Sequence, residues 1–326
     1  MTVGLGGNCE GAMRRSVLAV GGAAAGLLLG AAPAFAWGSE AHRTVALIAD
    51  KILQQSAPQV RAKVQQLLAG DKTNKWTKTD IAGEATWADV LRDKSEEARN
   101  ATSPWHSTKL KPDNPDLDAA CYGHTPLPPG YPASRGRPEN CSIDKVEQFV
   151  KELEDPETLP GERLAALQFT LNLVADLHDP LYAIDRGDQS GRCLAVQIGS
   201  AAPVRLAALW ESTLPRQAIG LNPAAAASHI FGTTKPEDAQ KWAEGKPADW
   251  VRDSYEVAKS VVYGFGGEPA AGKHTFPASG KEKDSCGPVD LYKVAADYET
   301  KGLAALKIQL AKAGVRLAAV LRGSLK

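Results

Sequence analysis

The sequence lacks an excess of charge of either sign, because 38 lysine and arginine residues balance 38 aspartate and glutamate residues among 326. A protein that packages nucleic acid neutralises the phosphates with a positive field over much of its surface, and this chain has no such field. Any phosphate-bearing ligand must therefore be held at a local site. Intrinsic disorder is excluded too, since 43% of the residues are hydrophobic, which is enough to build a core.

Long hydrophobic runs are also missing, except at the N-terminus. There two arginines precede an apolar run over residues 17–30, which leads into a small-x-small cleavage site, Ala-Phe-Ala, at residues 34–36. This order is typical of an export signal, so we expect residues 1–36 to be cleaved and the mature chain to begin at Trp37. The alternative is an uncleaved anchor, because residues 16–36 are nearly long enough to span a bilayer. With cleavage, we expect a secreted or periplasmic protein without stable membrane association.

Cysteine is scarce, and Cys9, one of five, lies in the predicted signal. The mature chain keeps four cysteines, and an even number in an exported protein indicates two disulfides. Three connectivities are possible. We favour Cys121–Cys141 and Cys193–Cys286, because the first pair would staple the loop rich in proline and glycine between its members. Four reduced, buried thiols are the alternative, which would suit a cytosolic protein.

Strand patterns are almost absent, and helical patterns dominate. Apolar residues recur at spacings of three and four from Val45 to Ile52, and further helices are predicted over residues 60–68, 142–153, 162–178, 249–263 and 292–321. The last is expected to bend or break near Gly302 or Gly314. Loops are predicted where proline, glycine and asparagine cluster, over residues 111–140, 185–200 and 264–288. We predict an all-α fold with a single domain over residues 37–326.

Several polar residues need a chemical explanation. Asn172 and Asp176 are four residues apart and share one face of a strongly apolar helix, where a buried carboxylate needs a cation or another partner. Other candidates are Trp37, whose free amine and carbonyl would form a chelate, and His42, Asp89, His106 and His178. Singly, each has an ordinary explanation as a hydrogen-bonded histidine or a capping aspartate. Together they favour zinc, which binds imidazole nitrogen and carboxylate oxygen.

These residues, in this order, resemble those of the S1/P1 nuclease family, with the zinc-dependent phospholipases C as more distant relatives. The matching segments are WGSEAHRTVALIA, TWADVLR, PWH, LVADLHDPLY, DRGDQSG, LWES, DSYEVAKSVVYG and AKAGVRLAAVL, which cover essentially all of residues 37–326. The resemblance implies a multi-helix domain of the phospholipase C/P1 nuclease type. It also implies three zinc ions in a cleft and hydrolysis of phosphoester bonds in single-stranded DNA or RNA, or in 3′-nucleotides.

The resemblance further implies which residues bind metal. Trp37, His42 and Asp176 would hold one ion, with Trp37 contributing its amine and its carbonyl oxygen. Asp89, His106 and Asp176 would hold a second ion, so that Asp176 bridges the two. Ions that share a carboxylate lie close enough together for a bridging hydroxide to act as the nucleophile.

The sequence also departs from the family pattern. A family histidine four residues before the bridging aspartate is Asn172 here, so the second ion keeps three of its four expected ligands. The third ion position loses more of its ligands, because its two histidines are replaced by Tyr182 and Ala207 and its aspartate by Glu211. Glutamate can bind zinc, but the methyl group of alanine cannot. We therefore expect one or two zinc ions rather than three.

Three functions are compatible with this ligand set. The first is a monomeric phosphoesterase, in which Asp89 orients the nucleophile and Arg92 neutralises charge on the phosphoryl oxygens in the transition state. The second is a non-catalytic descendant that binds a phosphate-bearing ligand or a protein. The third is a structural metal site that holds the N-terminus on the helical core. An open coordination position near Asp89 and Arg92 would favour the enzyme, and a fourth protein ligand would favour the structural site.

Overall fold

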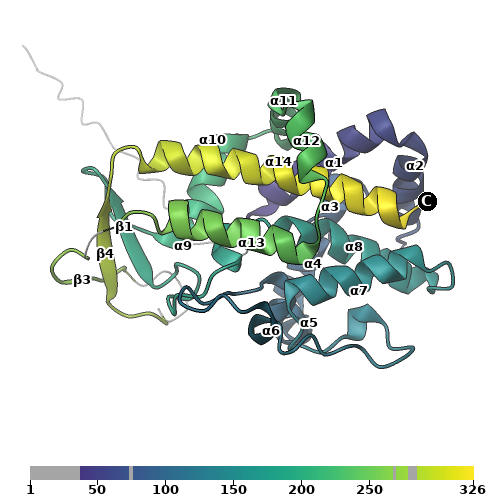
Figure 1. Ribbon diagram of the computed structural model, residues 1–326, viewed down its shortest axis with the longest axis horizontal. Coiled ribbons are helices and arrows are strands. Elements are labelled where there is room, and N and C mark those ends of the chain that lie inside the picture. The colour runs from purple at the N-terminus through teal and green to yellow at the C-terminus, as the bar shows by residue number, and fades with distance from the viewer. Residues whose placement is uncertain (1–36, 73–75, 267–268, 278–284) are drawn as a thin grey trace, which may run out of the picture. The chain divides into compact units, whose positions relative to one another are not determined.

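The structure is a computed structural model that describes residues 37–72, 76–266, 269–277 and 285–326 (Figure 1). The predicted signal peptide lies outside these residues. Helices dominate, as predicted: α1 (Ser39–Ser56), α2 (Pro58–Ala69), α3 (Ile81–Glu84), α4 (Trp87–Lys94), α5 (Glu96–Thr102), α6 (Leu117–Ala120), α7 (Ser142–Glu154), α8 (Pro160–Asp176), α9 (Leu206–Ala208), α10 (Leu214–Ile219), α11 (Pro223–Thr233), α12 (Pro236–Trp242), α13 (Pro247–Val257) and α14 (Tyr298–Ser324). Short 3₁₀ helices are η1 (Ser103–His106), η2 (Ala133–Arg135) and η3 (Pro180–Tyr182), and π-helical turns are η4 (Leu209–Thr213) and η5 (Ala258–Val262).

Helix α8 is the central element of the core. Every residue from Ala166 to Asp176 is buried, because the helix has no polar face to turn towards solvent. It packs against α1, α4, α7 and α14, which surround it with apolar side chains. Proline at its first position suits a helix start, where its missing N–H costs no hydrogen bond. The C-terminal end of this helix therefore carries Asn172 and Asp176 into the interior.

The long helix α14 differs from its prediction at two points. It begins at Tyr298 rather than Tyr292, and it runs without interruption past Gly302 and Gly314. The glycines serve close packing instead of breaking the helix. A Cβ at Gly314 would stand 2.5 Å from the Cβ of Ile48 in α1, and one at Gly302 would stand 2.9 Å from Leu214 Cδ1. Glycine thus allows α14 to approach α1 and α10 closely.

A small sheet was not predicted. Strands β1 (Leu194–Ile198), β2 (Val204–Arg205), β3 (Lys273–His274) and β4 (Val289–Val294) lie in the order β2-β1-β4-β3. The central strands β1 and β4 are parallel, with Leu194 opposite Asp290, and β2 and β3 add to them antiparallel. The sheet lies at the end of the helical array where α14 begins (Figure 1). Strands β1 and β3 fall in segments that the sequence analysis assigned to loops.

Both favoured disulfides are present. Cys121 bonds to Cys141, and Cys193 bonds to Cys286. Cys193 directly precedes β1 and Cys286 shortly precedes β4, so the second bond ties the same ends of the two parallel strands. The members of the pairs are 20 and 93 residues apart, and closing loops of such lengths stabilises a fold by roughly 3 and 5 kcal/mol in the chain-entropy picture.

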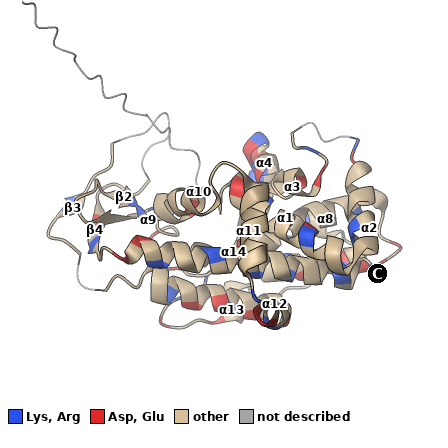
Figure 2. Cartoon of the chain, turned by 90° about the horizontal axis from the view of Figure 1, so that it is seen from above, with Lys and Arg blue, Asp and Glu red and all other residues tan. Residues whose placement is uncertain are grey.

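Charge is spread over the helices without a dominant sign. Figure 2 shows basic and acidic segments mixed along the elements, in keeping with the equal counts in the sequence. Among the helices of the described ranges, none is long and apolar enough to cross a bilayer.

The glycine contact in α14 leads to a stability prediction. Gly314→Ala should lower the free energy of unfolding by about 1–3 kcal/mol, because the added methyl group overpacks the contact with Ile48. Gly323→Ala in the same helix is the matched control, since its Cβ would meet nothing within 4 Å. The control should be neutral or more stable by up to about 1 kcal/mol, because alanine favours the helix. Urea denaturation followed by circular dichroism measures both, and equal effects would contradict the packing argument.

Candidate metal and active site

Four elements carry the predicted ligands to the buried end of α8. His42 lies in the first turn of α1, Asp89 in the first turn of α4 and His106 at the end of η1. Asn172 and Asp176 lie in the last turns of α8. The structure thus brings together residues that are up to 134 positions apart in the sequence, from position 42 to position 176.

Asp176 is the residue that joins the two histidines. Its Oδ2 lies 2.6 Å from His106 Nδ1, and its Oδ1 lies 3.5 Å from His42 Nε2. Burial raises the pKa of Asp176 well above its usual value, and the neighbouring Asp89 raises it further. Burial also lowers the pKa of His42 and lowers that of His106 more strongly. The imidazoles are therefore held neutral, which is the form that binds metal.

Several donor atoms of this cluster are buried without a conventional partner. His42 Nε2, His106 Nε2, Asp176 Oδ1 and Asn172 Oδ1 make no hydrogen bond to any described residue. His42 Nε2 approaches Asp89 Oδ2 only to 3.4 Å, which is long for a nitrogen–oxygen hydrogen bond. Leaving such atoms unpaired in the interior costs free energy. Imidazole nitrogen and carboxylate oxygen are zinc ligands, so the donor set fits this ion.

Asn172 ties Asp89 in place. Its Nδ2 donates to Asp89 Oδ2 and to the carbonyl oxygen of Ala85, both at 2.9 Å. On the other side, Arg92 Nη2 donates to Asp89 Oδ1 at 2.5 Å. The Asp89 side chain keeps 12% of its surface exposed, whereas that of Asp176 is fully buried. The cluster is therefore most accessible to solvent at Asp89.

Trp37 contacts an acid that the sequence analysis did not single out. The backbone N–H of Trp37 donates to Asp179 Oδ2 at 3.2 Å, and the tryptophan is buried. Asp179 also accepts a hydrogen bond from the backbone N–H of Leu181 through Oδ1. Burial raises the pKa of Asp179 to about 6. Asp179 lies beyond the end of α8 as the N-cap residue of η3, and the sequence offered no signal for its contact with the backbone of Trp37.

The residues of the third predicted ion position offer little to a metal. Ala207 and Tyr182 are buried, and the Glu211 carboxylate, also buried, makes no hydrogen bond within the described ranges. Burial raises the pKa of Glu211 well above its usual value, and Asp179 adds to this effect, while Arg192 and Lys109 oppose it. Burial and the nearby Glu211 raise the pKa of Tyr182 as well. One acid thus remains where the resemblance implies three ligands.

His178 is a structural residue. Its Nδ1–H donates to the Val174 carbonyl at 2.7 Å, and its Nε2 accepts from Arg316 Nη1 at 2.9 Å. Burial, together with Arg316, lowers the pKa of His178 to about 3, so the ring stays neutral. Both ring nitrogens are engaged, and this histidine contributes nothing to the cluster around Asp176.

Comparison with known proteins identifies the family of the chain. A sequence model of the S1/P1 nuclease family matches residues 37–326. Nuclease S1 from Aspergillus oryzae (strain ATCC 42149 / RIB 40) is 26% identical over 300 residues, which is 87% of this chain and 90% of that protein. The family match spans nearly the whole chain, and all the predicted ligands lie within it. The chain therefore belongs to the S1/P1 nuclease family.

Proposed function

We propose that the protein is a zinc-dependent phosphoesterase that cleaves single-stranded DNA or RNA, or 3′-nucleotides. Membership of a nuclease family supports the reaction class. The observation that carries the metal dependence is the buried cluster of His42, Asp89, His106 and Asp176, in which ring nitrogens and a carboxylate oxygen lack hydrogen-bond partners among the described residues. A divalent cation would satisfy these atoms and compensate the two buried carboxylates.

Two overlapping ligand sets are available for zinc. His42 and Asp176 would hold one ion together with Trp37, once cleavage frees its amine. Asp89, His106 and Asp176 would hold the other, with Asn172 able to offer only a neutral amide oxygen. Bound zinc would supply a nucleophile at neutral pH, by lowering the pKa of water, and positive charge for the phosphoryl oxygens.

Asp89 and Arg92 would perform the chemistry that depends on the protein. Asp89 is the most exposed member of the cluster, so the attacking water would enter on its side and hydrogen-bond to its carboxylate. The hydrogen bond from Arg92 fixes the orientation of that carboxylate. The guanidinium would also lie beside a phosphate bound next to Asp89, where it would stabilise the extra charge of the transition state.

The loss of ligands at the third ion position supports the alternative of a non-catalytic binding protein. Ala207 has no donor atom, and Glu211 alone does not make a zinc site. Losing an electrophile that stabilises the leaving oxygen would cost roughly 3–4 kcal/mol of transition-state stabilisation, by analogy with the loss of an oxyanion-hole donor. A descendant that binds a phosphate-bearing ligand or a protein partner without hydrolysing it is therefore the second candidate. Activity measurements on the mature protein, which we expect to be a monomer, would distinguish the phosphoesterase from the non-catalytic binding protein.

Metal stoichiometry follows from the ligand count. The mature protein should hold one zinc ion tightly, a second that chelators remove first, and none at the Glu211 position. Asp176→Ala should release both ions, because it removes the shared ligand, whereas His42→Ala should empty mainly the first position and His106→Ala the second. Elemental analysis after dialysis against a chelator measures these contents. Three zinc ions in the unmodified mature protein would show that the ligand count is wrong.

Activity depends on the Asp89 carboxylate in this proposal. Asp89→Asn keeps the shape of the side chain but removes its charge, and it should lower kcat for single-stranded DNA by about 10²–10³-fold, the range seen when a preorganised charge-stabilising group is lost. Glu256→Gln makes the same carboxylate-to-amide change on the exposed face of α13 and should leave the rate unchanged. A wild-type protein that is loaded with zinc but hydrolyses neither single-stranded DNA nor a 3′-nucleotide would favour the non-catalytic alternative.

Restoring the missing ligands tests the same argument in the opposite direction. The triple variant Asn172→His, Tyr182→His and Ala207→His should raise zinc content towards three ions per chain and increase phosphodiesterase activity. The increase is expected because histidine replaces an amide, a phenol and a methyl group at positions where the resemblance implies zinc ligands. A folded triple variant with unchanged zinc content would mean that these positions do not surround the ion sites.

A further inference from the structure

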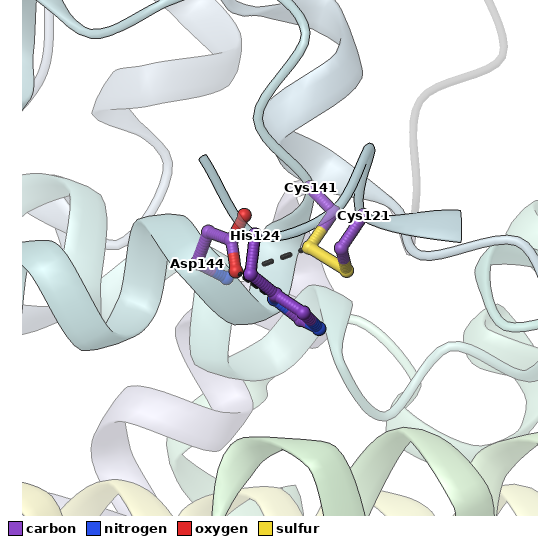
Figure 3. Close-up of side chains that lie close together, drawn as sticks. All are labelled: Cys121, His124, Cys141 and Asp144. Atoms are coloured by element: carbon purple, nitrogen blue, oxygen red, sulfur yellow. Dashed lines mark hydrogen bonds and ion pairs between the residues drawn. A yellow bond between two sulfur atoms is a disulfide. The ribbon is translucent and has the colours of Figure 1, made fainter. Parts of the chain in front are cut away.

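A second group of metal-binding side chains lies outside the cluster around Asp176. Cys121, His124, Cys141 and Asp144 place one ligand atom each within 4.8 Å of one another (Figure 3). In the sequence they follow the spacing Cys-x₂-His-x₁₆-Cys-x₂-Asp. Two Cys-x₂-Cys pairs separated by 15–20 residues are typical of structural zinc sites, and this motif keeps that spacing with one cysteine of each pair replaced by histidine or aspartate. Zinc accepts both replacements.

The backbone brings the two halves of the motif together. Tyr122, Gly123 and His124 all have positive φ angles, of 53°, 72° and 51°, which curl the chain after α6 and return His124 towards α7. Cys141 is the N-cap residue of α7, and Asp144 lies in the first turn of that helix. His124 Nδ1 lies 2.5 Å from Asp144 Oδ1, and Figure 3 shows the four side chains close together, with His124 drawn between Asp144 and the disulfide.

One atom of the group points to a missing ligand. Asp144 is 7% exposed, and its Oδ2 is buried without a hydrogen bond to any residue in the described part of the chain. Around a tetrahedral zinc ion, neighbouring sulfur and nitrogen or oxygen atoms lie about 3.3–3.8 Å apart, given bond lengths near 2.3 and 2.0 Å. To reach that geometry, the more distant ligand atoms, now up to 4.8 Å apart, must move closer together, while the two bonded sulfurs and the His124–Asp144 pair must move apart. In the structure the two sulfurs are joined as a disulfide, and a disulfide sulfur is not a thiolate ligand.

We propose that reduction of the Cys121–Cys141 disulfide converts this group into a four-ligand zinc site, formed by both thiolates, the His124 imidazole and the Asp144 carboxylate. The reductant is a dithiol, which supplies two electrons and two protons to break the S–S bond and is itself oxidised to a disulfide. Zinc then displaces the two thiol protons. The ion would join the loop to α7 as the disulfide does. The oxidised protein would thus be cross-linked here by the disulfide, and the reduced protein by zinc.

Two cavities are lined in part by the cysteines of this disulfide. A cavity of about 450 Å³ is lined by Cys121, Tyr122 and Arg137, among others. Another, of about 390 Å³, is lined by Cys141 together with Lys109 and Asp185. Both cysteines are buried, so a small dithiol and a metal ion would reach the sulfurs when the loop beside these cavities opens locally. This inference does not rest on the proposed phosphoesterase activity, since it uses none of the residues assigned to that reaction.

Cobalt(II) is the probe that separates this site from the other cluster. Thiolate ligands give tetrahedral cobalt an intense charge-transfer absorption in the near ultraviolet, which nitrogen and oxygen ligands alone do not produce. The experiment uses the Cys193→Ser/Cys286→Ser variant, so that the Cys121–Cys141 pair is the only disulfide. Reduction with a phosphine should create the absorption band at one cobalt per chain, and zinc should displace the cobalt. The oxidised protein should show no such band.

Ligand variants decide whether the proposed four residues hold the ion. His124→Ala and Asp144→Ala in the same background should weaken cobalt binding by more than about 100-fold, beyond the range for outer-shell partners. Cys121→Ser/Cys141→Ser, made in the otherwise wild-type chain, should abolish the band although it leaves the other cysteines. A band that survives His124→Ala, or its absence from the reduced protein, would overturn the proposal. If the reduced chain loses helicity without metal, zinc should restore the circular dichroism signal, and failure to restore it would also overturn the proposal.

Discussion

The burial of the Asp176 carboxylate is the constraint on which the site depends. A carboxylate at the inner end of an apolar helix is costly unless groups converge on it, and here His106 contacts it directly while His42 approaches it. Just beyond the end of α8, Ser254 Oγ donates to the Leu177 carbonyl and Gln309 Nε2 donates to the His178 carbonyl. Helices α13 and α14 thus help to fix the end of the helix that carries the acid.

Asn172 shows how one substitution changes the character of such a cluster. A histidine here would present a nitrogen lone pair, whereas the amide N–H of asparagine donates to Asp89. The hydrogen bond occupies an oxygen that a metal would otherwise bind, so the substitution removes one ligand and competes for another. In the proposed two-ion arrangement, the position that includes Asp89 would therefore be the weaker one, because a hydrogen-bond donor rather than an acceptor faces Asp89.

How much the sequence predicts depends on the range of the forces involved. The helices can be predicted from local apolar periodicity. The placement of Asn172 and Asp176 on one face of α8 can be predicted from their spacing. Strands β1 and β4 were not predicted because they pair across 96 positions of the sequence, with Leu194 opposite Asp290, and each is only five or six residues long. The packing role of Gly314 was not predicted for a similar reason, since it depends on a contact with Ile48 rather than on helix propensity. Asp179 was missed because its partner is the backbone of Trp37, which no side-chain pattern reveals.

Glu211 is a buried acid at the position where the family resemblance implies a third ion. A buried glutamate without a cation should be protonated, and burial indeed raises its pKa well above the usual value. Lys109 and Arg192 act in the opposite direction and favour the charged form. The positive charge that an ion would have concentrated at one point is therefore supplied diffusely by side chains. Diffuse charge stabilises a leaving oxygen less than a directly bound ion does, because the Coulomb energy falls with distance. In the proposed mechanism, hydrolysis would therefore depend mainly on the cluster formed by Asp89, Arg92 and Asp176.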